Sequence, residues 1–112
     1  MSRYGQEHPK EYSDKFDELR QNRAEVSFYK YGTAADNFGM KLVNALESHD
    51  LCIKKYLTTK NTEYLLDAAN YLMFEFMYPQ QEGAFFKATD SGESAGVAGT
   101  PVNQLRDPFF RG

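Results

Sequence analysis

The most apolar stretch of the chain, residues 61–78, has the sequence NTEYLLDAANYLMFEFMY and the spacing of a helix. At roughly 100° per residue, one broad apolar face is centred on four side chains, Leu66, Ala69, Met73 and Met77. Leu65, Leu72 and Phe76 widen this face. The arc left for solvent is narrow and holds Tyr64, Ala68 and Glu75. We therefore predict a helix that is buried on most sides, capped by Asn61 and ended by Pro79.

A first helix is predicted from about residue 11 to Tyr31. Either Pro9, as a first-turn residue, or Ser13, as an N-cap, would begin it, and Gly32 is placed to end it. One stripe of this helix carries Tyr12, Phe16, Leu19, Arg23 and Val26. The stripe predicts that the helix packs against a neighbour with an arginine on its inner side.

A second helix is predicted to run from Thr33 to about Leu57. Thr33 and Asp36 have the spacing of a capping box, with Asp in the place of the usual Glu. The apolar face of this helix holds Phe38, Leu42, Ala45, Leu46, Ile53 and Tyr56. The turn to the third helix is short, so successive helices are expected to lie antiparallel.

After the third helix the periodic pattern ends, and residues 79–112 are rich in Gly, Ser, Ala and Thr. Two aromatic pairs, Phe85–Phe86 and Phe109–Phe110, predict that parts of this arm dock on the helices or on a second copy of the chain. The polar residues 1–10 are expected to be loose. The predicted organisation is thus a loose N-terminus, a helical domain over residues 11–78 and an irregular C-terminal arm.

Three helices with such broad apolar faces cannot cover one another fully as a single unit. We therefore expect an all-α fold in which a three-helix protomer completes a four-helix-type bundle by homodimerisation. The extended Gly-rich C-terminal arm is expected to wrap over this bundle.

Composition narrows the possible functions mainly by exclusion. The chain has 112 residues, a formal net charge of −3 and a pI near 5.3, which suit one domain and do not favour nucleic-acid binding. No stretch is apolar enough for a membrane span. The lone Cys52 cannot form an internal disulfide, so we expect a reducing, cytoplasmic location and a structural thiol instead of a nucleophile.

Glu63, Asp67 and Asn70 share an arc of the third helix beside its apolar centre. Carboxylates on a largely buried helix are costly unless they are paired, protonated or bound to a metal. Two acids one turn apart suit Mg²⁺, and an amide one turn further suits a substrate contact. The structural alternative is that Glu63 serves the helix dipole, Asp67 pairs with an arginine and Asn70 hydrogen-bonds across the bundle.

The other two helices carry further candidate residues. Glu47 and Asp50 would lie opposite the acids of the third helix in an antiparallel pair, although Glu47 projects toward the polar side and fits a solvated face. His49 is interpreted as a core residue, with metal ligation as the alternative. Arg23 lies on an apolar stripe and needs an anion, either a carboxylate such as Asp67 or Asp50 or a ligand phosphate.

Two segments resemble a known family. The segment LLDAANYLMFEFM resembles the second carboxylate helix of the all-α nucleoside triphosphate pyrophosphohydrolases, the MazG-like superfamily. The segment KYGTAADNF is similar to the region ahead of the first carboxylate helix in some members, so the resemblance covers residues 30–77. The chain departs from the family pattern where its second acid pair is spaced i, i+4 instead of i, i+3. It also has Ala45-Leu46-Glu47 in the place of a Glu-Glu doublet.

The resemblance implies Mg²⁺-dependent cleavage of a nucleoside triphosphate to a monophosphate and pyrophosphate, in a helical dimer or tetramer. It implies Glu63 and Asp67 as catalytic residues. The implied metal ligands are Glu47, Asp50, Glu63 and Asp67. The implied substrate contacts are Asn70, Arg23 and Lys30, with Arg23 or Lys30 on the leaving pyrophosphate.

The main alternative is a non-enzymatic helical interaction protein of phage or mobile-element type. Such a protein would bind other proteins through its aromatic arm and exposed tyrosines. The enzyme needs Asp67 and an acid of the second helix in a shared open cavity. The interaction protein needs those acids to be neutralised internally, by Arg23 or by hydrogen bonds.

Overall fold

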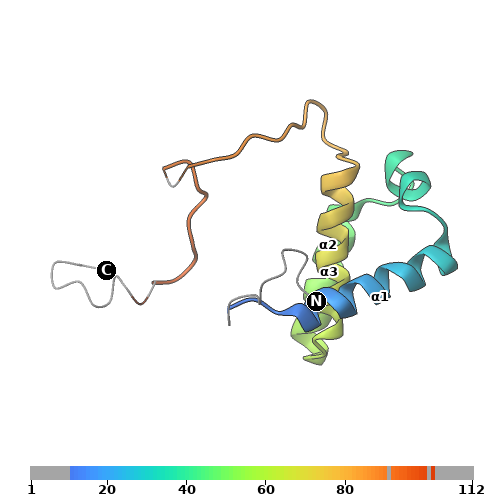
Figure 1. Cartoon of the computed structure of the whole chain (residues 1–112), viewed down its shortest axis with the longest axis horizontal. Coiled ribbons are helices and arrows are strands. Elements are labelled where there is room, and N and C mark those ends of the chain that lie inside the picture. Colours follow the sequence, from blue (N-terminus) through green and yellow to red (C-terminus); the bar gives the residue numbers. More distant parts are fainter. Residues whose placement is uncertain (1–10, 91, 101, 103–112) are drawn as a thin grey trace, which may run out of the picture.

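The computed structural model describes residues 11–90, 92–100 and 102, and within them the chain is all-α, as predicted. The elements in chain order are α1 (Asp14–Tyr31), the short π-helix η1 (Ala35–Gly39), α2 (Ala45–Thr59) and α3 (Glu63–Met77) (Figure 1). The predicted loose N-terminus with Pro9, and the end of the arm with Phe109 and Phe110, lie outside the described residues. None of the helices described is both long and apolar enough to cross a membrane.

α1 has the predicted boundaries because both of its ends carry local caps. The Oγ atom of Ser13 accepts a hydrogen bond from the Phe16 amide at 3.0 Å. At the other end Gly32 takes a φ of 92°, and its amide donates to the Phe28 carbonyl at 2.9 Å. None of the residues of α1 is buried, however, so its apolar stripe is only partly covered.

The predicted second helix, from Thr33 to Leu57, is interrupted, so this prediction is wrong. Thr33 Oγ1 accepts from the Asp36 amide at 3.1 Å as expected, but the segment that follows is only η1. Lys41 then takes a left-handed φ of 58°. α2 starts after Asn44, whose Oδ1 accepts from the amide of Glu47 at 3.0 Å.

A side chain from beyond α3 explains this interruption. Gln80 Nε2 donates to the carbonyl oxygens of Phe38 at 3.2 Å and of Val43 at 2.7 Å. The Phe38 carbonyl also accepts from the Lys41 amide at 3.1 Å, so Gln80 adds a second hydrogen bond there and links acceptors on both sides of the break. Glu75 accepts from the Gln80 amide at 2.9 Å and thereby holds Gln80 in place.

α3 begins and ends close to the predicted positions. Asn61 Oδ1 accepts from the Glu63 amide at 3.0 Å, and the last helical residue is Met77, shortly before Pro79. The start of the helix is therefore stabilised by a side chain that precedes it, and its end by a residue that cannot continue it.

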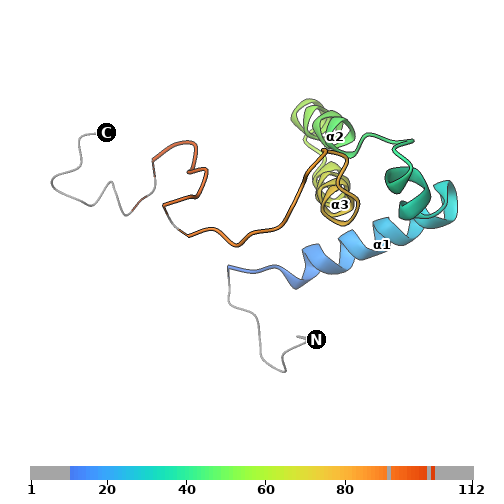
Figure 2. The same ribbon diagram turned by 90° about the horizontal axis from the view of Figure 1, so that it is seen from above.

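The faces of α3 differ from the prediction. Ala68, which was predicted to face solvent, is only 3% exposed, whereas Leu72 and Phe76 are 49% and 73% exposed. The reason is that α3 lies between α2 and α1 (Figure 2), so two sides of α3 are covered by helices instead of one broad face. The arc that carries Leu72 and Phe76 has no helix over it.

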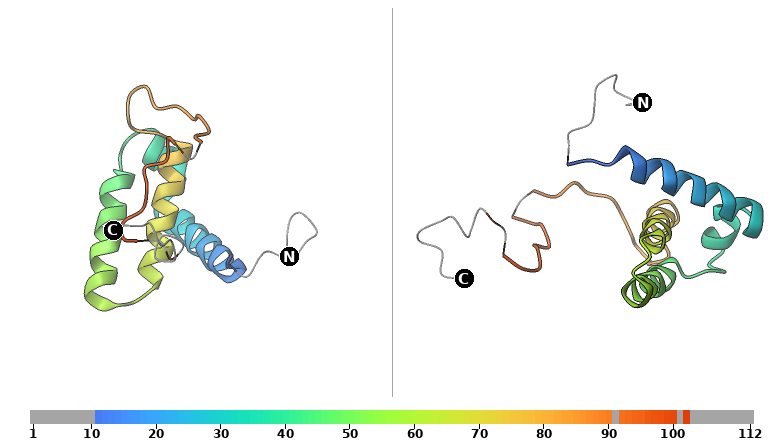
Figure 3. Two further views of the ribbon diagram at one scale, coloured as in Figure 1. Left: turned by 90° about the vertical axis from the view of Figure 1, so that its left-hand side faces the viewer. Right: turned by 90° about the horizontal axis from the view of Figure 1, so that it is seen from below.

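The core is small and lies where η1, α2 and α3 meet. Phe38 stacks on Phe74 at 4.7 Å between ring centroids, and Tyr71 meets Phe38 edge-on at 6.1 Å. The buried Ala45 and Ala68 have small side chains that let α2 and α3 approach closely. α2 and α3 lie side by side and antiparallel, as the short turn predicted (Figure 3), while α1 crosses α3.

Over residues 79–90 and 92–100 the arm has no helix, and it runs away from the helices instead of wrapping over them (Figure 1). Phe85 and Phe86 are 83% and 80% exposed. A single aromatic contact links this part of the arm to α3, between Phe86 and Phe76, with the ring centroids 6.4 Å apart.

Candidate functional site

Arg23 of α1 lies at the centre of the candidate site and contacts both acids of α3. Its Nε donates to Asp67 Oδ1 at 3.1 Å and its Nη2 donates to Asp67 Oδ2 at 3.1 Å. Its Nη1 forms an ion pair with Glu63 Oε1 at 3.0 Å. The planar guanidinium therefore binds one carboxylate with two parallel hydrogen bonds and a second carboxylate with its remaining nitrogen.

The two carboxylates differ in their contact with water. The side chain of Glu63 is 49% exposed and that of Asp67 is 25% exposed. The hydrogen bond to Asp67 raises the pKa of Arg23, burial lowers it, and the negative charges of Asp67 and Glu63 add to the rise. Arg23 is thus held in its charged form by the two acids that the sequence singled out.

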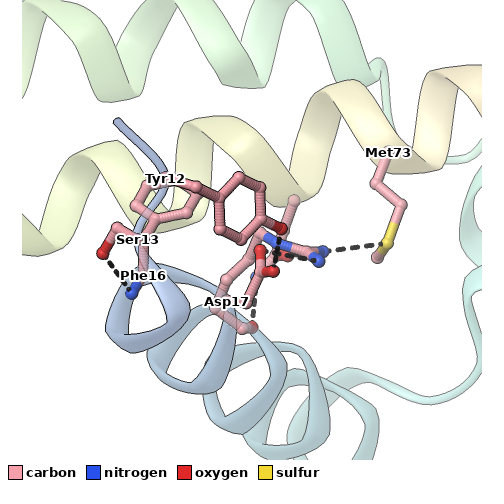
Figure 4. Close-up of polar contacts among 7 residues, drawn as sticks. Tyr12, Ser13, Phe16, Asp17 and Met73 are labelled. Carbon is pink, nitrogen blue, oxygen red and sulfur yellow. Dashed lines mark hydrogen bonds and ion pairs between the residues drawn. The ribbon is translucent and has the colours of Figure 1, made fainter. Parts of the chain in front are cut away.

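Asn70 is the third member of the predicted set and is also bound to α1. It is 5% exposed. Its Nδ2 donates to the Arg20 carbonyl oxygen at 2.9 Å, and its Oδ1 accepts from Arg20 Nη1 at 3.3 Å. Arg20 Nη1 also lies 3.2 Å from Met73 Sδ. The hydroxyl of Tyr12 donates to the carboxylate of Asp17 (Figure 4). The contacts of Asp67 and Asn70 match the structural alternative drawn from the sequence.

A cleft of about 190 Å³ lies between α1 and α3 next to these contacts. Its polar lining includes Arg23, Ser27, Lys30, Tyr31, Asp67 and Asn70. Lys30 is placed over the ring of Tyr31, with Nζ 5.2 Å from the ring centroid. All three residues that were expected to contact a substrate therefore line one cleft.

The acids of α2 do not join this cleft. Glu47 is exposed, and the Asp50 side chain is 75% exposed. Asp50 Oδ1 lies 3.1 Å from Nδ1 of His49, so the histidine is paired with its sequence neighbour. Across the described residues no group of three or more His, Cys, Asp or Glu side chains is placed to hold a metal ion.

Cys52 and Tyr71 are two titratable groups between α2 and α3. Burial raises the pKa of the Cys52 thiol, and the charge of Asp67 adds to this rise. Burial also raises the pKa of Tyr71, with smaller contributions from Cys52, Asp67 and Tyr31. A raised pKa leaves little thiolate at neutral pH, which agrees with the predicted structural role of Cys52.

Besides the complementary charge of Arg23 and Asp67, the sequence carried a second signal for the contact of α1 with α3. Arg20 and Arg23 are three residues apart on α1, and Asp67 and Asn70 are three residues apart on α3. The structure joins Arg23 to Asp67 and Arg20 to Asn70, so both members of each pair lie on the contact between the two helices. Gln80 had no such signal because its partners lie in an irregular segment.

Neither family models, nor curated proteins, nor solved structures give a match to this chain. The resemblance to the MazG-like superfamily therefore stays a prediction.

Proposed function

We propose that this chain is a non-enzymatic helical interaction protein that acts by binding other protein chains. The observation that carries the proposal is the position of Arg23, which forms ion pairs with both Glu63 and Asp67. Acids that are needed as metal ligands must keep oxygen atoms free for the metal. Both oxygens of Asp67 are instead hydrogen-bonded to Arg23.

The exposed apolar surface gives independent support. Large apolar side chains remain open on every main helix, including Val26 at 54%, Leu57 at 67% and Phe76 at 73%. The arm adds Phe85 and Phe86, which are among the most exposed side chains described. A large share of exposed apolar side chains is a feature of proteins that bind other protein chains.

A second candidate function is binding of a phosphate-bearing ligand, such as a nucleotide, by a degenerate relative of the pyrophosphohydrolases. It is favoured by the cleft between α1 and α3, where Arg23, Lys30 and Asn70 lie together. Glu63 and Asp67 are both bound to Arg23, and no set of three or more ligands for a metal gathers among the described residues. We therefore derive no magnesium-dependent step, and what this candidate retains is anion binding by Lys30 and Arg23.

Thermal unfolding separates the two functions. The melting temperature is measured while MgCl₂ is titrated, alone and with each common nucleoside triphosphate. A ligand that binds the folded state raises the melting temperature by an amount that grows with its concentration. The interaction protein predicts no rise under any of these conditions.

The outcome that contradicts the proposal is a rise that depends on ligand concentration and is lost in Asp67→Asn or Lys30→Ala. Asp90→Asn serves as the control, because Asp90 is an exposed acid of the arm that accepts only from local amides. A rise that survives unchanged in all three variants does not involve the cleft.

A further inference from the structure

Two arginines of α1 make its specific contacts with α3. Arg23 binds Asp67 with two hydrogen bonds of 3.1 Å and Glu63 with an ion pair of 3.0 Å. Arg20 donates to Asn70 at 3.3 Å, and Asn70 donates to the Arg20 carbonyl oxygen at 2.9 Å. We call these five residues the arginine clasp.

The apolar side chains of α1 add little packing to this contact. None of the residues of α1 is buried. Leu19 and Val26 line a pocket of about 320 Å³ together with Leu66 of α3, and they remain 39% and 54% exposed. Apolar side chains that interdigitate leave few gaps larger than one water molecule. The apolar contact between α1 and α3 is therefore loose, and the clasp is what fixes α1 in place.

The other elements are held together by contacts that do not involve α1. Phe38 of η1 stacks on Phe74 of α3, with the ring centroids 4.7 Å apart. Gln80 binds both sides of the break between η1 and α2. Ala45 of α2 and Ala68 of α3 are only 0% and 3% exposed. We therefore expect η1, α2 and α3 to stay folded when α1 moves.

The connection between α1 and η1 has the features of a hinge. Gly32 takes a φ of 92°, which favours glycine, at the point where α1 ends. Asn37 Nδ2 donates to the carbonyl oxygens of Tyr31 at 2.9 Å and of Thr33 at 3.1 Å. Figure 2 shows η1 next to this end of α1, while the rest of α1 crosses α3. Asn37 thus fixes the C-terminal end of α1, and the clasp holds its middle.

The clasp lies where dissolved ions can reach it. The side chains of Arg23, Glu63 and Asp67 are 40%, 49% and 25% exposed. Salt screens the attraction between charges that are in contact with water. Burial of apolar groups, which holds η1, α2 and α3 together, is not weakened by such screening. Ionic strength therefore acts on the contact of α1 with α3 more than on the rest of the fold.

We propose that α1 is a lid, held on α3 by the arginine clasp, which opens as one unit when the clasp is weakened. Opening uncovers Asn70, which is 5% exposed in the closed state, and frees the carboxylates of Glu63 and Asp67 from Arg23. A helix of 18 residues is marginally stable in water on its own, so α1 loses helix when it is released. This lid does not depend on the function proposed above.

Hydrogen exchange of the full chain, followed by NMR at constant pH over a series of NaCl concentrations, tests the lid. The amides in the middle of α1, such as those of Arg23 and Ala24, should exchange about threefold faster in about 0.5 M NaCl than in about 0.05 M NaCl. The amides in the middle of α2 and α3 should not exchange faster. They also serve as the internal reference for any effect of salt on the chemical exchange rate.

Two variants of α1 with the same change in charge identify the clasp as the cause. Arg23→Gln removes the centre of the clasp, whereas Lys15→Gln removes a charge from an exposed position in the first turn of α1. At low salt Arg23→Gln should speed exchange in α1 about fivefold, because two charge-assisted hydrogen bonds are lost. It should also respond less to NaCl than the wild type does. Lys15→Gln should behave as the wild type.

Three results overturn the lid. The first is exchange in α1 at the same rate as in α2 at every salt concentration, because the chain then opens only as a whole. The second is exchange in α1 of the wild type that does not change with salt. The third is equal exchange in α1 of Arg23→Gln and Lys15→Gln. The first two are measured on the wild type, so the lid stays testable even if Arg23→Gln fails to fold.

Discussion

At the scale of single residues, the guanidinium of Arg23 reaches two carboxylates one helical turn apart, and the two ion pairs are unequal. Asp67 receives two hydrogen bonds and is 25% exposed, whereas Glu63 receives one contact and is 49% exposed. Water screens the outer pair more strongly than the inner pair. Of the two ion pairs, the inner one should therefore contribute more to holding α1 against α3.

Double-mutant cycles of urea unfolding test this difference. The cycle of Arg23→Gln with Asp67→Asn should give a coupling of about 1 kcal/mol, because two charge-assisted hydrogen bonds are lost from a partly buried site. The cycle of Arg23→Gln with Glu63→Gln should give about 0.3 kcal/mol, the value usual for an exposed pair. Equal couplings in the two cycles would contradict this account.

The raised pKa of Cys52 predicts a dependence of stability on pH. The folded chain keeps the thiol proton to higher pH than the unfolded chain, because burial disfavours the thiolate. This contribution is complete below the ordinary thiol pKa of about 8.5 and is lost as pH rises through the folded pKa. The free energy of unfolding should fall over this range in the wild type and fall less in Cys52→Ser.

Tyr71 acts in the same direction at higher pH, because its pKa is also raised by burial. Tyr71→Phe therefore provides the control, since it should leave the fall near the thiol pKa unchanged and reduce the fall above it. If Cys52→Ser followed the wild-type curve throughout, the thiol would not be the cause.

At the scale of elements, helix ends that are capped by nearby residues can be predicted from the sequence, whereas those that depend on residues far along the chain cannot. Ser13, Gly32 and Asn61 act within a few residues, and each marks a boundary that the sequence predicted. The break between η1 and α2 is different, since the partners of Gln80 lie 42 and 37 residues away in the chain. No local sequence pattern predicts such a contact.

Replacing Gln80 should therefore destabilise the segment between η1 and α2 without unfolding α2 or α3. Gln80→Ala removes two hydrogen bonds to the carbonyl oxygens of Phe38 and Val43, which should cost about 1–2 kcal/mol in urea unfolding. Hydrogen exchange at the Val43 amide, which donates to the Asn37 carbonyl, should become faster. Gln81→Ala is the control because Gln81 is exposed, and an equal loss in that variant would exclude the role of Gln80.

At the scale of the whole molecule, the sequence predicted the all-α class, the antiparallel order of α2 and α3, and the interaction of Arg23 with Asp67 as one of its alternatives. These follow from periodicity, turn length and complementary charge. It did not predict which arc of α3 is buried, because α3 is apolar on several sides and the position of α2 decides between them. Ala68 was misplaced for that reason.

The arm has a further consequence for how the molecule responds to proteases. Trypsin needs an extended, accessible segment, and the arm around Lys87 is exposed and free of helix, whereas Lys54 and Lys55 lie within α2. Among the basic residues that the structure describes, Lys87 should be cut first, and mass spectrometry should then find the helices in one intact fragment. Lys87→Gln should slow this cleavage, and a first cut inside α2 would contradict it. Trypsin would thus remove the arm while the helices remain folded, so the two parts of the chain differ in their resistance to proteolysis.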